Sequence, residues 1–458
     1  MKVIICGAGQ VGSGIAERLS AEGNDVSIID ANPALVDRAN NMLEVSALAG
    51  NAAHPDVLER AGANDADMLI AVTLHDEVNM VACQVAHTLF EIPTKIARVR
   101  AQTYLDKQWS RLFARESMGI DHIISPEIEV GDAILRRLDL PGAFETASFA
   151  DGKVAMIGVS CSQDCPVIDT PLKQLTELFP DLPAITVALS RRGKLFIPRG
   201  HDQIEANDEA YIISPAGQVS RTLKIFGHEE RKARRIVIAG GGSIGLYLAR
   251  CIEARDPNIR VKVIEKDRER ALEIAELLDR AVVLNGTALS EDMLREADIV
   301  SADTLVAVTN DDQINLLTSA LAKQLGCKSS LCLVNNSDYS GMIRSLGIDA
   351  QINPRTTTAS KILQYVRRGR IRGVYSIHHG AGEIIEAELL ETAPILNKPL
   401  HEAPISEGVR IGAILRNGEV LKPTGALELE AQDRVVLFAL SDYLREVEQM
   451  FRVTPDYF

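Results

Sequence analysis

Two glycine-rich segments hold the residues of this 458-residue chain whose spacing points most directly to chemistry. Each has the pattern G-x-G-x-x-G and directly follows a short apolar run; the first contains Gly7, Gly9 and Gly12, and the second contains Gly240, Gly242 and Gly245. In this pattern the first glycine permits a tight strand-to-helix turn, the second lets the backbone approach a pyrophosphate, and the third allows close helix packing. An anion binds at the start of the following helix, where N–H groups are unpaired. The spacing predicts two nucleotide sites, whose helix starts add Gln10 and Val11 in the first and Ser243 and Ile244 in the second.

An acidic residue follows each glycine segment at the distance expected of a ribose ligand. Asp30 closes the apolar pattern over 24–29, and Glu265 closes the one over 260–264. In dinucleotide-binding folds, a carboxylate about 20 residues beyond the glycines binds the ribose hydroxyls. The same charge would repel a 2′-phosphate. The pattern therefore favours NAD(H) or an adenosine nucleotide over NADP(H).

The regular alternation of strand and helix patterns predicts the fold that positions these residues. After each glycine segment it indicates a doubly wound parallel sheet, and residues 67–73, ending in Thr73, recur as residues 303–309, ending in Thr309. Each sheet is followed by a smaller βαββ pattern with a glycine turn, at Gly193 and at Gly418. The prediction is an α/β chain with two Rossmann-like domains, each followed by a small βαββ domain, over residues 1–140, 141–227, 228–371 and 372–458.

Composition narrows the classes of function. A net charge of −14 argues against nucleic-acid binding, because a polyanion would be repelled. No apolar run approaches the roughly 18 residues that span a bilayer and no targeting stretch precedes Gly7, so a soluble cytoplasmic protein is expected. The histidines and cysteines lack metal-ligand spacing, and no metal site is expected. Cys161 and Cys165 are interpreted as incidental surface thiols.

The combination of these motifs resembles one family over essentially the whole chain. The segment Gly7–Gly12 with Asp30, residues 71–73, residues 97–100 (A-R-V-R) and the repeated small module are similar to the tandem RCK-type (KTN-type) regulatory subunits of bacterial Trk potassium-uptake systems. The resemblance implies a non-enzymatic subunit that binds NAD(H), or alternatively ATP or ADP. It implies a homo-oligomeric ring attached peripherally to the cytoplasmic face of the membrane through the membrane-embedded Trk potassium-transporting subunit. It also implies that Thr73 lies on the adenosine side and that Arg98 binds the phosphates.

The second copy departs from this pattern at the phosphate-binding arginines. When the copies are aligned on the tyrosines that follow, Leu333 takes the place of Arg98 and Asn335 takes the place of Arg100. Phosphate charge in the second site must then be met by the helix start or by other residues. We expect the two sites to hold different nucleotides or to respond differently to the same one.

An NAD-dependent oxidoreductase is the alternative function. It would need a general acid or base near the nicotinamide. His54 and His75 follow the third and fourth strand patterns, but the matching positions in the second copy are Ser290 and Asp311. No catalytic residue is therefore assigned.

Overall fold

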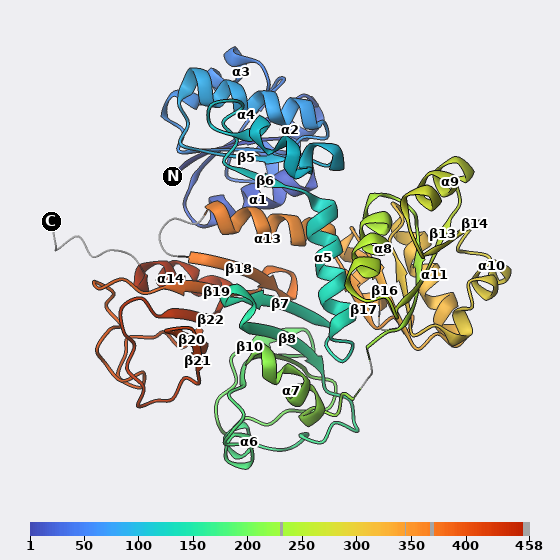
Figure 1. Cartoon of the computed structure of the whole chain (residues 1–458). Coiled ribbons are helices and arrows are strands. Elements are labelled where there is room, and N and C mark those ends of the chain that lie inside the picture. Colours follow the sequence, from blue (N-terminus) through green and yellow to red (C-terminus); the bar gives the residue numbers. More distant parts are fainter. Residues whose placement is uncertain (230–231, 344, 367–370, 452–458) are drawn as a thin grey trace. The chain divides into compact units, whose positions relative to one another are not determined.

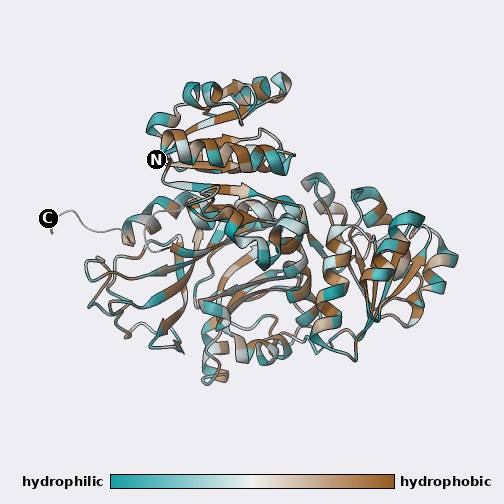
Figure 2. Cartoon of the chain, turned by 45° about the horizontal axis from the view of Figure 1, so that its top comes forward, coloured by the Kyte–Doolittle hydropathy of each residue, from teal (hydrophilic) through white to brown (hydrophobic). Residues whose placement is uncertain are grey.

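The chain forms two compact units, each built from two separate stretches of sequence. In this computed structural model, which describes residues 1–229, 232–343, 345–366 and 371–451, unit 1 comprises Met1–Glu129 with Pro354–Arg367, and unit 2 comprises Val130–Asn353 with Arg368–Phe458 (Figure 1). The strands of the sheets are mostly hydrophobic, and hydrophilic residues gather on the helices (Figure 2). Each unit therefore has its own buried core.

Unit 1 contains a six-stranded parallel sheet of the Rossmann order. Along the sheet the strands are β3 (Ser46–Ala49), β2 (Asp25–Asp30), β1 (Lys2–Cys6), β4 (Met68–Ala71), β5 (Thr94–Arg98) and β6 (His122–Ile124). The connecting helices are α1 (Gln10–Ala21), α2 (Pro33–Met42), α3 (Pro55–Arg60) and α4 (Asp76–Phe90). The strand order reverses direction between β1 and β4, which is the point where sheets of this order generally bind ligands, beyond the carboxyl ends of the strands.

A helix that follows the second sheet in sequence completes unit 1. Helix α13 (Pro354–Val366) buries Ile362 and Leu363 in the same core as Ile5 and Ile15. Its Tyr365 ring stacks on His122 of β6, with ring centroids 3.9 Å apart. Burying each of the two aliphatic side chains contributes about 2 kcal/mol. The sheet built by the first repeat is therefore covered partly by a helix from the second.

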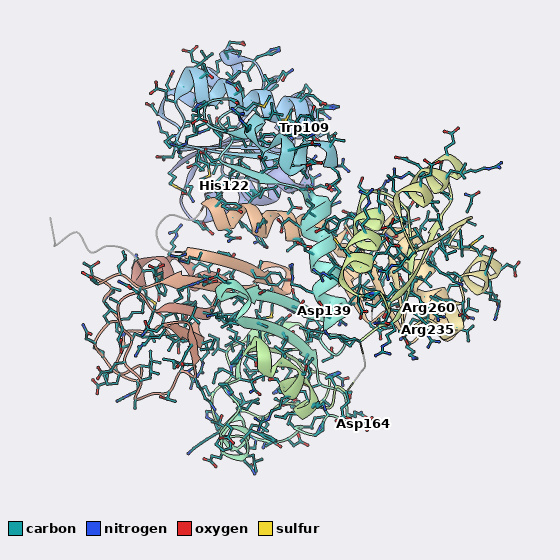
Figure 3. The ribbon with its side chains drawn as sticks, in the orientation of Figure 1. Trp109, His122, Asp139, Asp164, Arg235 and Arg260 are labelled. Carbon is teal, nitrogen blue, oxygen red and sulfur yellow. The ribbon has the colours of Figure 1, made fainter. Side chains whose placement is uncertain are left out.

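Unit 2 contains the matching six-stranded parallel sheet. Its order is β14 (Val282–Asn285), β13 (Arg260–Glu265), β12 (Arg235–Ala239), β15 (Thr304–Ala307), β16 (Ser329–Leu333) and β17 (Ala350–Ile352). The helices are α8 (Ser243–Arg255), α9 (Arg268–Leu277), α10 (Glu291–Glu296), α11 (Asp312–Gln324) and α12 (Ser340–Ile343). Arg235 and Arg260 are register partners at the amino ends of β12 and β13 (Figure 3). The second glycine segment lies at the opposite end of these strands.

Helix α5 (Pro126–Asp139) begins in unit 1, but its residues from Val130 onward belong to unit 2. Its Ile134 is buried in the core of the second parallel sheet. The hydroxyl of Tyr247, on α8, donates to Asp132 Oδ1 at 2.8 Å. A Cβ on Gly131 would come within 2.3 Å of the Tyr247 ring, so only glycine fits at this crossing of α5 and α8.

Two antiparallel sheets of five strands complete unit 2. The first has the order β10 (Lys194–Phe196), β9 (Ile185–Arg191), β11 (Glu209–Pro215), β8 (Val154–Ser160) and β7 (Glu145–Phe149), with α6 (Leu172–Leu178) and α7 (Val219–Ile225). The second has the order β18 (Ile371–Ile377), β19 (Gly382–Glu388), β22 (Arg434–Leu440), β20 (Val409–Arg416) and β21 (Glu419–Leu421), with α14 (Leu444–Met450). Side chains of both sheets, including Phe149 and Phe438, share one core.

These observations confirm the predicted fold class, while the predicted domain boundaries stay predictions. The small domains differ from the expected βαββ pattern in two ways. Each has five strands, and the described residues 389–408 of the second contain no helix where the first has α6. Pro404 follows four residues after Leu400, and its missing N–H opposes a helix there. Within the described residues, none of the helices is both long enough and apolar enough to cross a lipid bilayer.

The interpretation of Cys161 and Cys165 as surface thiols is wrong. Their exposed fractions are 0% and 6%, and both pack in the core of the first small domain with Val159 and Leu189. The loop that carries them folds back onto the sheet, since the Cys161 N–H donates to the carbonyl of Asp208 at 2.8 Å. The loop that carries both cysteines is therefore held against the sheet by a hydrogen bond to a residue distant in the chain, which its local sequence does not reveal.

The carboxyl of Glu145 is expected to make the stability of the small domains depend on pH. Burial raises its pKa to about 8, against hydrogen bonds from Tyr375 and Tyr211 and with the charge of Glu209 in support. A raised carboxyl pKa means that the folded state binds the proton more tightly, so stability is lost as the pH rises from about 5 to about 8. We expect Glu145→Gln to flatten this decline in urea unfolding, and Glu419→Gln, whose side chain is exposed on β21, to leave it unchanged. If the free energy of unfolding fell equally steeply with pH in Glu145→Gln and in the unmodified chain, Glu145 would not be the group responsible.

Candidate nucleotide-binding sites

The first glycine segment forms a tight turn between β1 and α1. Gly7 has φ of 112°, and a Cβ there would lie 3.0 Å from the carbonyl oxygen of Val72. A Cβ on Gly12 would lie 1.8 Å from the Gly7 carbonyl oxygen. At Gly9, by contrast, φ is −66° and a Cβ would meet no atom of the described residues within 4 Å. The turn itself therefore requires Gly7 and Gly12, whereas the space over Gly9 stays open for something other than the chain.

The carboxylate of Asp30 lies against this turn. Its Oδ2 accepts from the Ala8 N–H at 2.7 Å, and its Oδ1 accepts from the Asn32 N–H at 2.8 Å. Asn32 in turn caps α2, with its side chain accepting from the Ala34 N–H. Asp30, the predicted ribose ligand, is thus held at Ala8, next to Gly9, where the pyrophosphate is predicted to lie. Gln10 and Val11 open α1 beside it, exposed and half-buried respectively.

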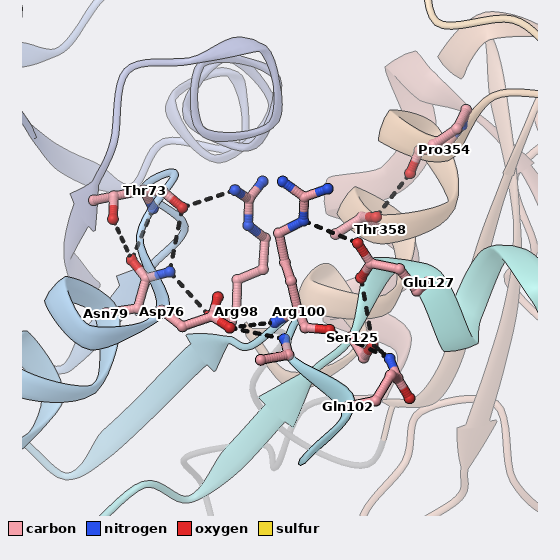
Figure 4. A network of polar contacts seen from close by, with 11 residues as sticks. Thr73, Asp76, Asn79, Arg98, Arg100, Gln102, Ser125, Glu127, Pro354 and Thr358 are labelled. Carbon is pink, nitrogen blue, oxygen red and sulfur yellow. Dashed lines mark hydrogen bonds and ion pairs between the residues drawn. The ribbon is translucent and has the colours of Figure 1, made fainter. Parts of the chain in front are cut away.

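Asn79, a fully buried residue on α4, ties Thr73 to the end of β5 (Figure 4). Its Oδ1 accepts from the Thr73 N–H at 2.8 Å and from the Thr73 hydroxyl at 2.7 Å. Its Nδ2 donates to the carbonyl of Thr73 at 3.2 Å and to that of Arg98 at 2.9 Å. One amide therefore sets the relative positions of two predicted site residues. Sequence analysis did not identify Asn79, because its contact with the end of β5 joins residues 19 positions apart.

The guanidinium of Arg98 lies at the carboxyl end of the sheet with spare hydrogen-bonding capacity. Its Nη2 donates to the carbonyl of Thr73 at 2.8 Å. Its Nε is buried and has no hydrogen-bond partner among the residues that the structure describes. Burial, together with the charge of neighbouring Arg100, lowers the pKa of Arg98 below its usual value. An anionic ligand would relieve this cost and accept from the orphaned donor, so the residues present fit a phosphate group.

Arg100 is already paired with a carboxylate. Its Nε donates to Glu127 Oε1 at 2.9 Å, where Glu127 lies in the first turn of α5 (Figure 4). Its backbone N–H donates to Asp76 Oδ2 at 2.9 Å. Of the two arginines on this segment, Arg98 is therefore the one with charge left for a ligand. Glu127 carried no signal in the sequence, because its partner lies 27 residues earlier.

The second site repeats the first in its backbone frame. Gly240 has φ of 113°, and a Cβ on Gly245 would lie 1.9 Å from the Gly240 carbonyl oxygen, whereas a Cβ on Gly242 would meet nothing within 4 Å of it in the described chain. The Thr309 N–H and hydroxyl donate to Asn315 Oδ1 at 2.9 and 2.7 Å. Helix α8 opens with exposed Ser243 and half-buried Ile244. The structure therefore brings each predicted set together in its own unit.

Side-chain charge distinguishes the two sites. The carbonyl of Leu333 accepts from Asn315 Nδ2, as that of Arg98 does from Asn79, which confirms the alignment of the two positions. Leu333 is buried and apolar. The side-chain Nδ2 of Asn335 donates to Asp312 Oδ1 at 2.9 Å. The Arg98 and Arg100 positions of the second site therefore offer no cation.

The two histidines considered for catalysis occupy N-cap positions. His54 precedes α3 and His75 precedes α4. Their counterparts Ser290 and Asp311 cap α10 and α11 and accept hydrogen bonds from backbone N–H groups there. A helix-capping role explains the polar residues of the second copy, whereas the side chains of His54 and His75 make no capping hydrogen bond. The structure gives no separate reason to assign either histidine to proton transfer.

Replacing Asn79 or Asn315, each of which has a buried side-chain amide, should destabilise the two parallel sheets to a similar extent. Asn79→Ala and Asn315→Ala each leave a threonine N–H and the carbonyl at the end of the next strand without their partner, at a cost of about 1–3 kcal/mol. We expect both variants to lower the melting temperature in differential scanning calorimetry. Glu77→Ala, on the exposed side of α4, serves as the control. A melting temperature unchanged in Asn79→Ala would show that the amide does not hold the strand ends.

Comparison with solved structures defines the class of fold. The GsuK channel bound to NAD has a TM-score of 0.61 at 16% identity, covering 98% of this chain and 78% of that chain. The GsuK RCK domain has a TM-score of 0.60 at 16% identity, covering 98% of this chain and 94% of that one. Two parallel and two antiparallel sheets in alternating order along the sequence are thus the fold of tandem RCK domains.

Sequence comparison then gives the family. Residues 3–126 and 236–354 match the TrkA-N domain, and residues 384–452 match the TrkA-C domain. The chain is 58% identical over 458 residues to the Trk system potassium uptake protein TrkA of Azorhizobium caulinodans, and 40% identical over 462 residues to that of Halomonas elongata, with all of each chain covered. The chain belongs to the TrkA family of potassium-uptake proteins. This confirms the family to which the sequence motifs pointed.

Proposed function

We propose that the chain is a non-enzymatic regulatory subunit that binds NAD(H) or an adenine nucleotide and thereby gates a membrane-embedded Trk potassium transporter. Its relatives are named as components of a potassium-uptake system. The observation that carries the proposal is the buried, partnerless Nε of Arg98, whose guanidinium also bonds the carbonyl of Thr73, the residue that adjoins Gly7 of the glycine turn. A solved channel of the same fold is described as bound to NAD. The cytoplasmic face of the membrane is the location that such a subunit requires.

The ligand is proposed to lie along the turn of each parallel sheet. In the first site Gly7, Gly9 and Gly12 would face the pyrophosphate, Asp30 the ribose and Arg98 a phosphate. The carboxylate already accepts two backbone N–H groups, which keeps its oxygens at the turn. NAD(H) bound there would supply a dinucleotide whose charge is sensed by Arg98. A side chain able to exchange a proton with its nicotinamide is not needed for that role.

The subunit is proposed to act as a homo-oligomeric ring. Large apolar side chains remain exposed on equivalent helices of both repeats: Val81 on α4 is 43% exposed and its counterpart Leu317 on α11 is 55% exposed. Leu89 on α4 and Trp109 are also exposed. Large apolar side chains that are exposed on corresponding helices support a role for these helices in contacts between proteins. Self-association through such faces would let nucleotide-dependent motion act on a transporter.

Potassium uptake measured in proteoliposomes tests the proposal. The transporter would be reconstituted with the unmodified chain or with Gly9→Asp, and uptake followed with and without NADH, ATP and ADP. The aspartate side chain enters the open space over the turn and repels phosphate, while the backbone at Gly9 is compatible with any residue. We expect nucleotide to change uptake with the unmodified chain and to change it less with the variant. If none of these nucleotides changed potassium uptake with the unmodified chain, the gating role would be refuted.

A further inference from the structure

The second site carries a cation that the first site lacks, on the opposite side of the glycine turn from the missing arginines. Arg270 lies in the first turn of α9 and donates from Nε to the carbonyl of Gly241 at 3.0 Å. From this contact, and resting on the proposed nucleotide binding, we infer that Arg270 binds the adenosine end of the second ligand. The second site would then recognise an adenine nucleotide by its base and ribose, with little dependence on its phosphates.

The contacts of Gly241 place Arg270 beside the ribose-binding carboxylate. The Gly241 N–H donates to Glu265 Oε2 at 2.7 Å, and its carbonyl accepts from Arg270. The other carboxylate oxygen, Oε1, accepts from the Asp267 N–H at 2.9 Å. Carboxylate and guanidinium therefore flank a single residue of the turn. A ribose held by Glu265 would bring its base within reach of Arg270.

The residues around Glu265 and Arg270 differ from those at the corresponding positions of the first site. A Cβ on residue 241 would lie 2.5 Å from Ile274 Cδ1 and 3.1 Å from Glu265 Oε2, so glycine leaves room for both side chains where the first site has Ala8. The first site combines Ala8 with the shorter Asp30. The residue that matches Arg270, three positions after the cap of the equivalent helix, is Leu35. Three substitutions at one end of the site thus accompany the loss of two arginines at the other.

The chemistry of arginine suits contact with an adenine base. A planar guanidinium stacks on aromatic rings, with a gain of about 1–2 kcal/mol when partly desolvated. The Arg270 side chain is 28% exposed, and its plane is held by the ion pair of Nη1 with Glu273 Oε2 at 2.7 Å. With Leu333 at the position of Arg98, additional phosphates meet no matching side-chain cation there. Base recognition therefore outweighs phosphate recognition in this site.

Titration calorimetry with AMP, ADP and ATP in a Gly9→Asp background tests the inference on the full chain. Blocking the first site leaves only the second to bind. We expect the three dissociation constants to agree within about threefold, and Arg270→Leu to weaken all three by about tenfold. In the reciprocal Gly242→Asp background, where the first site binds, ATP should bind at least about tenfold more tightly than AMP because Arg98 meets its phosphates.

A purely structural role for Arg270 would appear differently. Arg270→Leu would then lower the melting temperature of the nucleotide-free chain and leave the second-site affinities within twofold, which would overturn the inference. A steep preference of the second site for ATP over AMP, or for NADP over NAD, would overturn it as well. If the second site binds no nucleotide while the first does, the inference fails and the proposed function survives; if the unmodified chain binds none, the proposed function fails.

Discussion

Replacing Arg98 with alanine is expected to weaken nucleotide binding in the first site by about 10- to 100-fold. The side chain supplies a buried guanidinium whose Nε has no partner in the described chain, and a hydrogen bond from such a charged donor to phosphate contributes about 1.5–3 kcal/mol. The backbone should tolerate the loss, because the carbonyl of Thr73 keeps its hydrogen bond from Asn79. Fluorescence titration with NADH in a Gly242→Asp background measures the effect on one site alone.

Two further variants separate the charge of Arg98 from its shape. Arg60→Ala removes the same charge from the exposed end of α3 and should leave the affinity unchanged. Arg98→Lys keeps the charge but loses the planar fork, so an intermediate affinity is expected. Equal affinity for Arg98→Ala and the unmodified chain would remove Arg98 from the site.

Gly12→Ala is expected to destabilise unit 1 by about 3 kcal/mol or more, because an added Cβ would lie 1.8 Å from the Gly7 carbonyl oxygen and the backbone must shift. Gly245→Ala should do the same in unit 2, where the corresponding distance is 1.9 Å. A destabilisation of this size lowers the melting temperature of its unit by about 10 °C in calorimetry.

Gly9→Ala is the matched control for this destabilisation. Its Cβ meets no described atom within 4 Å and its φ of −66° suits any residue, so the melting temperature should not fall. If Gly9→Ala and Gly12→Ala were equally destabilising, the division of the glycines into one that faces a ligand and others that the turn itself requires would be wrong.

Local spacing made much of the fold and part of each site predictable. The apolar runs before the glycines became β1 and β12, and Asp30 and Glu265 end β2 and β13 as expected. These features depend on residues near one another in sequence, where strand and turn preferences operate directly. The alignment of Leu333 with Arg98 was also correct, since both carbonyls accept from the equivalent asparagine.

Contacts between distant segments could not be predicted in this way. Asn79 reaches the carbonyl of Arg98, 19 residues away, only because β4 and β5 are parallel neighbours. The sequence of α13 is amphipathic but does not say which of two similar sheets it covers. The local sequence around Arg270 is that of an ordinary surface helix, and only its contact with Gly241, 29 residues earlier, shows that it lies at the turn.

Binding stoichiometry measured by isothermal titration, followed by recovery of the ligand, tests the central claim most directly. Two nucleotide sites that hold their ligand without converting it should give two molecules bound per chain. Either Gly9→Asp or Gly242→Asp should halve that number, and the double variant should bind none. The NADH or ADP recovered by chromatography should be unchanged. No measurable binding of NAD, NADH, ATP, ADP or AMP, or steady conversion of a bound nucleotide, would contradict the account.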